Sequence, residues 1–460
     1  MYDQPGRHWF TDHGCAAVTL YRPEDDLCTG LFKPVFRWLD TPNGAGSDPL
    51  YVTFRDDFND ENPFDYRAPS CDAIFDDGYG IVDREWPWND SIELIVCYQY
   101  RNTADPNSYW HTGVTALQWR DDDAYQFWTK EPTERIDYLL MPQQFPDHGE
   151  FNPDIAYNHM NGDAYCVYSE LQTDDNHSWI RYRKYDRVLN VILPGEWLVQ
   201  RPDHNGHDPS IDVGLIDFSG IAYNMVGVSY TAQFHDPDGG GDQLTHCGYH
   251  VCASGWCTSW LDTDRTSFAV MNPAYPYRDA GLTCVDISPN DNYVHFAACT
   301  YTQVVGSDGF GPITEIYVVK FFGDYEDLLT HTWVNPVIDN LADGLYPSIA
   351  INQQAGEDDD IYASVTYMGQ EDQQAILHPV ATWVQLDPGE ENVDWSNWVW
   401  GTAPTITGNF NVSEIPFINP GISTAIVTQG NNNYWAAWCD RTEMEPPPQE
   451  VWAAWGYADQ

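Results

Sequence analysis

The chain has 460 residues, of which 42% are hydrophobic and 15% aromatic, and this composition excludes an intrinsically disordered acidic protein. Its 70 Asp and Glu residues outnumber 20 Lys and Arg, and the resulting net charge of -50 excludes a protein that binds nucleic acid through the phosphate backbone. No run of about 18 apolar residues occurs, so no membrane span is predicted.

The acidic charge makes cations the expected small partners. Carboxylates that are screened or neutralised by salt or by Ca²⁺ repel one another less, so one reading is a protein that works with bound calcium. The other reading is an acidic surface that serves solubility alone. The composition leaves both open.

The first 30 residues are expected to hold a lead-in and one strand, at residues 15–21, that lies ahead of the repeats described below. Residues 1–5 lack the basic and apolar regions of a signal peptide, so either the numbering begins at a mature end or the protein stays inside the cell. Eleven cysteines favour the first alternative and an extracellular or cell-surface location.

An internal repeat occupies residues 31–460. Each copy opens with a short apolar strand introduced by Pro or a small residue, passes through a polar turn, and enters an aromatic, β-branched strand. The two clearest copies cover residues 153–168 and 347–367. Further copies begin at Pro209, Ala280 and Pro420, and two weaker ones near Pro34 and Gly80.

These seven starts recur at roughly 65 residues, which is room for four strands and their loops. Helical periodicity is almost absent. The pattern therefore predicts an all-β chain that forms a single seven-bladed β-propeller domain of four-stranded blades over residues 1–460. Only three strands fit after Pro420, so we expect the strand at 15–21 to complete the last blade and close the ring.

The phrase Pro153-Asp154-Ile155-Ala156 followed by an aromatic strand resembles the blades of sialidase-like (BNR-type) extracellular β-propellers. The resemblance implies a fold. The Asp-box of that family, Ser-x-Asp-x-Gly-x-Thr-Trp, is absent from every blade, so the resemblance implies no sialidase activity.

Two similar loops precede first strands and are expected to meet at one mouth of the propeller. One carries Asp147 and His148, and the other carries Asp203, His204 and His207. Carboxylates gathered at one mouth focus a negative potential and favour a bound cation or ligand. The competing interpretation is that these residues form Asx-turns before strands.

A second acidic loop carries Asp236, Asp238 and Asp242 around a run of glycines. Alternating carboxylates on a glycine-rich loop are typical of sites that surround Ca²⁺ with oxygen atoms. The loop lacks the terminal bidentate Glu of an EF-hand, and a simple hairpin tip fits the sequence equally well.

Cys252 and Cys257 flank four residues, Ala-Ser-Gly-Trp. If these form a hairpin loop, the two cysteines face each other across the ladder, so a disulfide is predicted. Trp86 and Trp88, in Trp-Pro-Trp-Asn, lie in a loop-like context and are candidates for stacking on sugar rings. The basic strand with Arg181, Arg183 and Lys184 is predicted to pair with neighbouring carboxylates or to bind an anionic sugar.

No P-loop, Gly-x-Ser-x-Gly or His-Glu-x-x-His motif is present. The leading hypothesis is a non-catalytic secreted or cell-surface propeller that binds glycans or cations and assembles with copies of itself as an extracellular scaffold. The alternative is a glycoside hydrolase or polysaccharide lyase on a propeller fold, which needs a pair of carboxyl groups that a linear sequence does not select.

Overall fold

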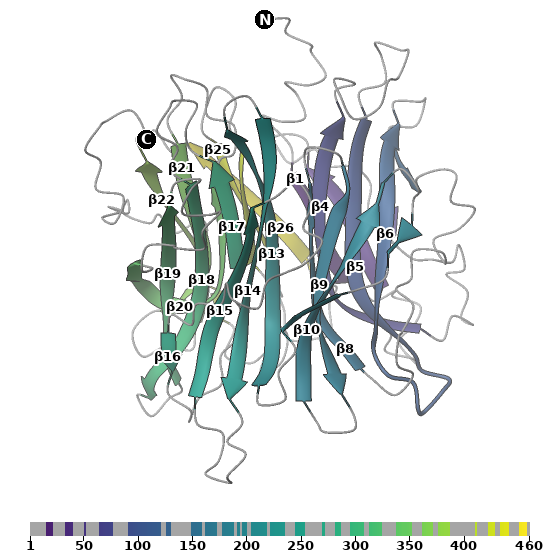
Figure 1. The fold of residues 1–460 in the computed structure, drawn as a ribbon, viewed down its shortest axis with the longest axis horizontal. Helices are drawn as coiled ribbons and strands as arrows, with labels where there is room; N and C mark the ends of the chain where they lie inside the picture. Colours follow the sequence, from purple (N-terminus) through teal and green to yellow (C-terminus); the bar gives the residue numbers. More distant parts are fainter. Residues whose placement is uncertain are drawn as a thin grey trace, which may run out of the picture. The chain divides into compact units, whose positions relative to one another are not determined.

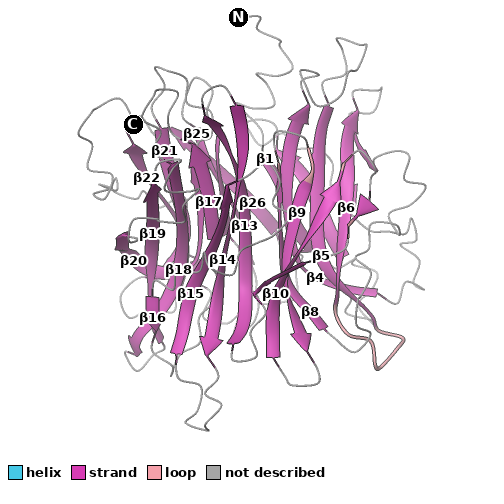
Figure 2. Cartoon of the chain, viewed as in Figure 1, coloured by secondary structure: helices cyan, strands magenta, loops and turns pink. Residues whose placement is uncertain are grey.

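The computed structural model describes 26 strands together with residues 103–110, 158, 162–163, 187 and 193 between them (Figures 1 and 2). All the regular elements in this described part are strands, so the all-β prediction is confirmed there. Because it contains no helix, it also contains none that is long and apolar enough to cross a membrane. The chain divides into two compact units, residues 1–211 and 212–460.

Three antiparallel sheets make up the first unit, and strand β13 begins in it. The first sheet has the order β1-β2-β3, the second β4-β5-β6-β7, and the third β11-β10-β9-β8 with β12 also paired to β10. The strands are β1 (Cys15–Tyr21), β2 (Lys33–Leu39), β3 (Leu50–Tyr51), β4 (Phe64–Asp76), β5 (Ser91–Asn102), β6 (His111–Arg120), β7 (Gln126–Thr129), β8 (Gly149–Tyr157), β9 (Ala164–Gln172), β10 (His177–Asp186), β11 (Val191–Ile192), β12 (Glu196–Val199) and β13 (His204–Phe218).

The second unit continues the same chain-order pairing. Its sheets have the orders β13-β14-β15-β16, β17-β18-β19-β20-β21-β22-β23 and β24-β25-β26. The further strands are β14 (Ile221–Phe234), β15 (Leu244–Ala253), β16 (Ala269–Met271), β17 (Gly281–Asp286), β18 (His295–Ser307), β19 (Pro312–Gly323), β20 (Val337–Ile351), β21 (Ile361–Gln370), β22 (Ile376–Leu386), β23 (Phe410–Asn411), β24 (Ile422–Val427), β25 (Asn433–Asp440) and β26 (Glu450–Tyr457).

Strand β20 serves two meanders in turn. Its first half, from Val337 to Asp343, pairs with β19, and its second half, from Gly344 to Ile351, pairs with β21. The seven-stranded sheet is therefore two four-stranded antiparallel meanders that share one long strand.

The N-terminal strand does not pair as predicted. Along its whole length β1 pairs with β2, from Cys15 opposite Leu39 to Tyr21 opposite Lys33. Among the described pairings, the last three strands form a sheet of their own. The expectation that residues 15–21 complete the last blade is wrong in this structure. The physical reason is that β2 is the next strand along the chain, so closing the short loop between β1 and β2 costs little entropy.

Three strands that each begin a meander, β4, β8 and β20, contain a β-bulge at the corresponding place. The register shifts between Arg67 and Ser70 in β4, between Phe151 and Asp154 in β8, and between Leu345 and Ser348 in β20. Each bulge contains a proline, namely Pro69, Pro153 and Pro347. Proline has no N–H to donate, so a bulge is one of the few places where a paired strand tolerates it.

The best-defined core lies between the sheets β4–β7 and β8–β12, whose strands β4, β5 and β6 pack against β8. Its members are small or medium apolar side chains and tyrosines, at most 3% exposed: Ile95, Cys97, Val114, Ala116, Ile155, Tyr157, Ala164, Cys166, Tyr168 and Tyr185. They alternate along each strand, as residues on one face of a sheet must. Burial of each large side chain contributes about 1.5–3 kcal/mol to stability.

Candidate functional site

Asp154 ties together three strands that belong to different sheets. It lies on β8, immediately after the bulge, and is half-buried. Its Oδ1 accepts hydrogen bonds from Ser70 Oγ on β4 (2.5 Å) and from the N–H of Ile155 (3.0 Å). Its Oδ2 accepts from Ser210 Oγ (2.7 Å) and from the N–H of Ile211 on β13 (2.9 Å).

Asp72 on β4 makes a similar link, but to β8 alone. Its Oδ2 accepts a 2.7 Å hydrogen bond from the N–H of Tyr157, so β4 and β8 are joined at two points. Strands β4, β8 and β13 each end the order of their sheet, and side-chain carboxylates and hydroxyls replace the ladder that such edges lack. Four donors occupy both oxygens of Asp154, which makes this carboxylate a structural clamp.

Sequence reasoning recognised the strand starts at Pro153 and Pro209 but missed the role of Asp154 and the copy in β4. That copy is Pro69-Ser70-Cys71-Asp72. The weak start predicted near Gly80 lies outside the described residues, and Pro34 lies on β2, a middle strand. The available signal was the shared pattern of a proline followed by Ser or Asp at positions 69, 153, 209 and 347.

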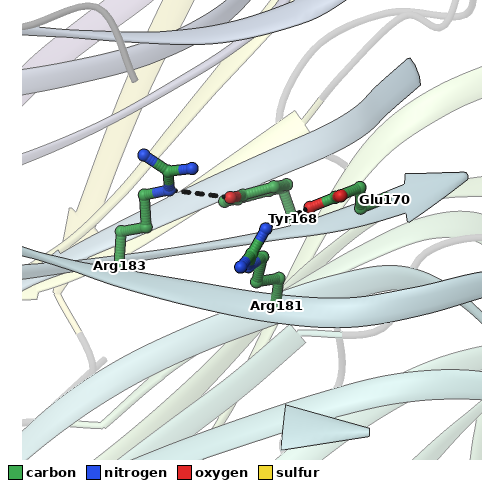
Figure 3. A network of polar contacts seen from close by, with 4 residues as sticks. All are labelled: Tyr168, Glu170, Arg181 and Arg183. Atoms are coloured by element: carbon green, nitrogen blue, oxygen red, sulfur yellow. Dashed lines mark hydrogen bonds and ion pairs between the residues drawn. The ribbon is translucent and has the colours of Figure 1, made fainter. Parts of the chain in front are cut away.

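The basic strand β10 turns its arginines inward. Arg181 Nη1 donates to Glu170 Oε2 at 2.8 Å, and both side chains are only 2% exposed. Arg183 Nε donates to the hydroxyl of Tyr168 at 2.9 Å (Figure 3). Lys184 forms an ion pair with Asp163. The prediction of pairing with carboxylates is confirmed for Arg181 and Lys184, and burial excludes these two arginines as a glycan site.

An exposed hairpin tip joins β5 to β6 at the end of the sheet where β4 begins. It comprises residues 103–110 and is the pink loop at the lower right of Figure 2. Asn102 Oδ1 accepts from the N–H of Ala104 and Asp105 Oδ1 from that of Asn107, each at 2.9 Å. Ser108 Oγ accepts from the N–H of Asn102 at 3.0 Å. These Asx-type bonds hold the tip in one conformation.

Two aromatic residues, Tyr109 and Trp110, stand at the end of this tip. Tyr109 is 41% exposed, and among the described large apolar side chains only Val191 is comparably exposed. The guanidinium carbon of Arg101 lies 4.6 Å from the ring centroid of Trp110, which is a cation–π contact. We call Arg101, Asn107, Tyr109 and Trp110 the hairpin platform.

Behind the platform, the rings of Tyr100 and His111 lie 5.4 Å apart at 37°. Burial lowers the pKa of His111 below its ordinary value, because a buried imidazole loses the hydration that stabilises its charged form. At neutral pH His111 is therefore a neutral ring beside Tyr100.

In the second unit, Glu315 on β19 accepts hydrogen bonds from Tyr317 Oη (2.5 Å) and from Asn340 Nδ2 on β20 (2.9 Å). Burial and then this hydrogen bond raise the pKa of Tyr317 to about 12. The phenol therefore stays protonated at physiological pH, and it acts as a hydrogen-bond donor to Glu315.

Several predicted site residues lie outside the described residues: Trp86, Trp88, Asp147, His148, Asp203, Asp236, Asp238, Asp242 and Cys257. Cys252 lies in β15, opposite Val226 of β14. His204 and His207 lie on β13, which begins at His204, so they belong to the strand and not to a preceding loop. Within the described part of the chain, no three His, Cys, Asp or Glu residues are grouped so as to hold a metal ion.

No protein-family model matches the chain, and no curated protein matches it either. Among solved structures, the chain is similar to the Hadza microbial sialidase Hz136, with a TM-score of 0.44 and 11% identity over 92% of this chain and 73% of that one. It is also similar to the GH93 α-L-arabinofuranosidase of Fusarium graminearum in complex with arabinobiose (TM-score 0.41, 10% identity, 88% of this chain and 96% of that one).

A third similar structure is that of the polysaccharide lyase Uly1, with a TM-score of 0.40 and 10% identity over 95% of this chain and 88% of that one. Likenesses of this degree concern the course of the chain and transfer no chemistry to its residues.

Proposed function

We propose that this chain is a non-catalytic β-propeller that binds glycans at the hairpin platform and acts as an extracellular or cell-surface scaffold. The observation that carries the proposal is the β5–β6 tip, a hydrogen-bonded loop with an exposed Tyr109 and, next in sequence, Trp110 in cation–π contact with Arg101. The acidic surface repels anionic ligands. The exposed aromatic ring at the tip therefore favours a neutral, polar ligand.

A sugar ring fits the chemistry of this tip. A pyranose has an apolar face of C–H groups and a rim of hydroxyls, and Tyr and Trp combine a flat apolar body with a polar edge. The exposed amide of Asn107 offers both a donor and an acceptor to hydroxyls. Because the loop is held by its own hydrogen bonds, binding orders few side chains and costs little entropy.

The hydrogen bonds of Asp154 make it a structural residue and not a general acid or base. A general acid or base must exchange a proton with a substrate, and Asp154 accepts four hydrogen bonds from its own chain. Of the alternatives, a glycoside hydrolase requires two other carboxyl groups about 5–9.5 Å apart that face an open pocket, and a lyase requires a base that removes a proton from the sugar.

The finer architecture belongs to the same proposal: seven blades in one domain, with three described strands in the first and last of them. Its support is the run of antiparallel meanders and the recurring proline bulge in β4, β8 and β20. The proposal also includes calcium binding at Asp236, Asp238 and Asp242. It further includes glycan contacts at Trp86, Trp88 and the mouth residues, and association of the chain with copies of itself.

The test is co-sedimentation with insoluble polysaccharides, followed by calorimetry with soluble fragments of any that bind. Tyr109→Ser removes the exposed ring, and we expect affinity to fall about tenfold, which corresponds to about 1.4 kcal/mol. Val191→Ser is the matched control, because Val191 is the other exposed large apolar side chain, at 38%. Equal binding by both variants, or no binding of the unmodified chain to any polysaccharide, would overturn the proposal.

A further inference from the structure

Two buried thiols meet between neighbouring sheets of the first unit. Cys97 on β5 is fully buried and Cys166 on β9 is 2% exposed, and both belong to the core between the sheets β4–β7 and β8–β12. The two thiols are neighbours in this core, since hydrogen bonding with Cys166 is one of the causes that raise the pKa of Cys97. Two thiols in one core, carried by strands of two packed sheets, are the starting point from which an inter-sheet disulfide forms.

We infer that Cys97 and Cys166 form a disulfide that joins the second strands of two neighbouring sheets when the chain folds in an oxidising environment. Both are thiols in the structure, so the bond is a covalent state of the chain beyond the one described. The inference is independent of glycan binding, because neither cysteine belongs to the hairpin platform.

The chemistry is thiol–disulfide exchange with a small-molecule disulfide such as oxidised glutathione. The Cys97 thiolate attacks one sulfur of that oxidant, which releases one thiol and leaves a mixed disulfide on Cys97. The Cys166 thiolate then attacks the Cys97 sulfur, forms the Cys97–Cys166 bond and releases the second thiol. The two protein thiols lose two protons and two electrons, and the oxidant is reduced to two thiols.

The exchange must precede closure of the core. Burial, followed by the hydrogen bond with Cys166, raises the pKa of Cys97 well above its ordinary value, so the folded thiol stays protonated and unreactive. Reagents also have no access to a side chain with no exposed surface. The bond therefore forms during folding, and a chain that folds reduced keeps both thiols.

Cys71 provides an internal control. It lies on β4, opposite Val96, while its neighbour Ser70 lies opposite Cys97. Side chains alternate between the faces of a sheet, so Cys71 lies on the opposite face from Cys97.

The experiment is to refold the full chain with a glutathione redox buffer, block remaining thiols in denaturant, and map tryptic peptides without reduction. Cleavage after Lys and Arg places Cys71, Cys97 and Cys166 on separate peptides, residues 68–84, 85–101 and 136–181, each with one cysteine. We expect the peptides of Cys97 and Cys166 to be linked. Recovery of both as blocked thiols, or either one linked to a different cysteine, would overturn the inference.

A second readout is the melting temperature with and without a reductant. Chain refolded in the redox buffer should melt several degrees higher than chain refolded with reductant, because the cross-link restricts the unfolded state. Cys71→Ala should keep this difference, and Cys97→Ala and Cys166→Ala should each abolish it. A difference that persists in all three variants would assign the effect to other cysteines and contradict the inference.

Discussion

The Asp154 side chain joins the edge strands β4, β8 and β13, which form no backbone ladder with one another among the described pairings. A charge-assisted hydrogen bond is roughly twice as strong as a neutral one, and this carboxylate accepts four bonds from three strands. The two hydroxyl donors, Ser70 and Ser210, are half-buried, so few water molecules compete for the same oxygens. Loss of the carboxylate would leave strands β4, β8 and β13 without these links.

Replacement of Asp154 by Asn tests the clamp. The amide has nearly the same shape, but its NH2 group would face donors, so we expect the free energy of unfolding to fall by about 2–3 kcal/mol. Urea denaturation followed by fluorescence measures it. Asp105→Asn is the control, because Asn also accepts the Asx-turn hydrogen bond at the exposed tip. Equal stability of the two variants would show that Asp154 is not a clamp.

The sequence predicted some of these residue contacts and not others, for a physical reason. Arg181 and Glu170 lie on adjacent strands of one hairpin, 11 residues apart, so pairing with a nearby carboxylate was readable. Asp154 bonds to Ser70 and Ser210, which are 84 and 56 residues away. Which strands approach one another over such separations depends on how the sheets pack, and no local pattern encodes it.

At the scale of elements, the β9–β10 hairpin contains charge where a core is usually apolar. Glu170 and Arg181 are almost completely buried and so is Arg183, whose cation lies 6.0 Å from the ring of Tyr168 (Figure 3). Burial removes the hydration of both partners, so the pair is stable only when it is complete.

Glu170→Gln should therefore destabilise the chain by about 3–5 kcal/mol, since it leaves the Arg181 cation buried without its counter-charge. The double variant Glu170→Met, Arg181→Met should recover most of the loss, because it removes both charges together. Thermal and urea unfolding of the single and double variants measure the coupling. Additive losses in the double variant would contradict a direct buried pair.

Strand positions were predictable where a proline or a glycine turn precedes an apolar run. Copies at Pro153, Pro209 and Pro347 became β8, β13 and β20, because a proline before an apolar run leaves a local signature. The residues before Pro209 were expected to form a loop, yet β13 includes His204 and His207. The proline lies inside the strand, and the sequence pattern predicted it as the start.

At the scale of the whole molecule, the dominant feature is the net charge of -50. Like charges repel in the compact state more than in the extended one, so salt should stabilise the chain. The pairing of β1 with β2 belongs to this scale too, because the sequence predicted the last blade as the partner of residues 15–21 and the structure pairs them with the next strand along the chain.

If the loop with Asp236, Asp238 and Asp242 holds calcium, millimolar CaCl2 should raise the melting temperature more than NaCl of equal ionic strength. A ligand that binds only the folded chain adds about 2.7 kcal/mol at one hundred times its Kd. Replacement of the three carboxylates by Asn should remove the calcium-specific part and leave the salt effect. Identical melting curves in the two salts would leave charge screening alone.

The central claim is that the chain binds glycans without cleaving them, and one measurement tests both halves. The chain is incubated with each polysaccharide that it sediments with, and the supernatant is assayed for reducing ends and for the unsaturated sugars that lyases release. We expect retention that depends on Tyr109 with no release of product above a protein-free control. Product that accumulates with time and with protein concentration would contradict the account and establish an enzyme.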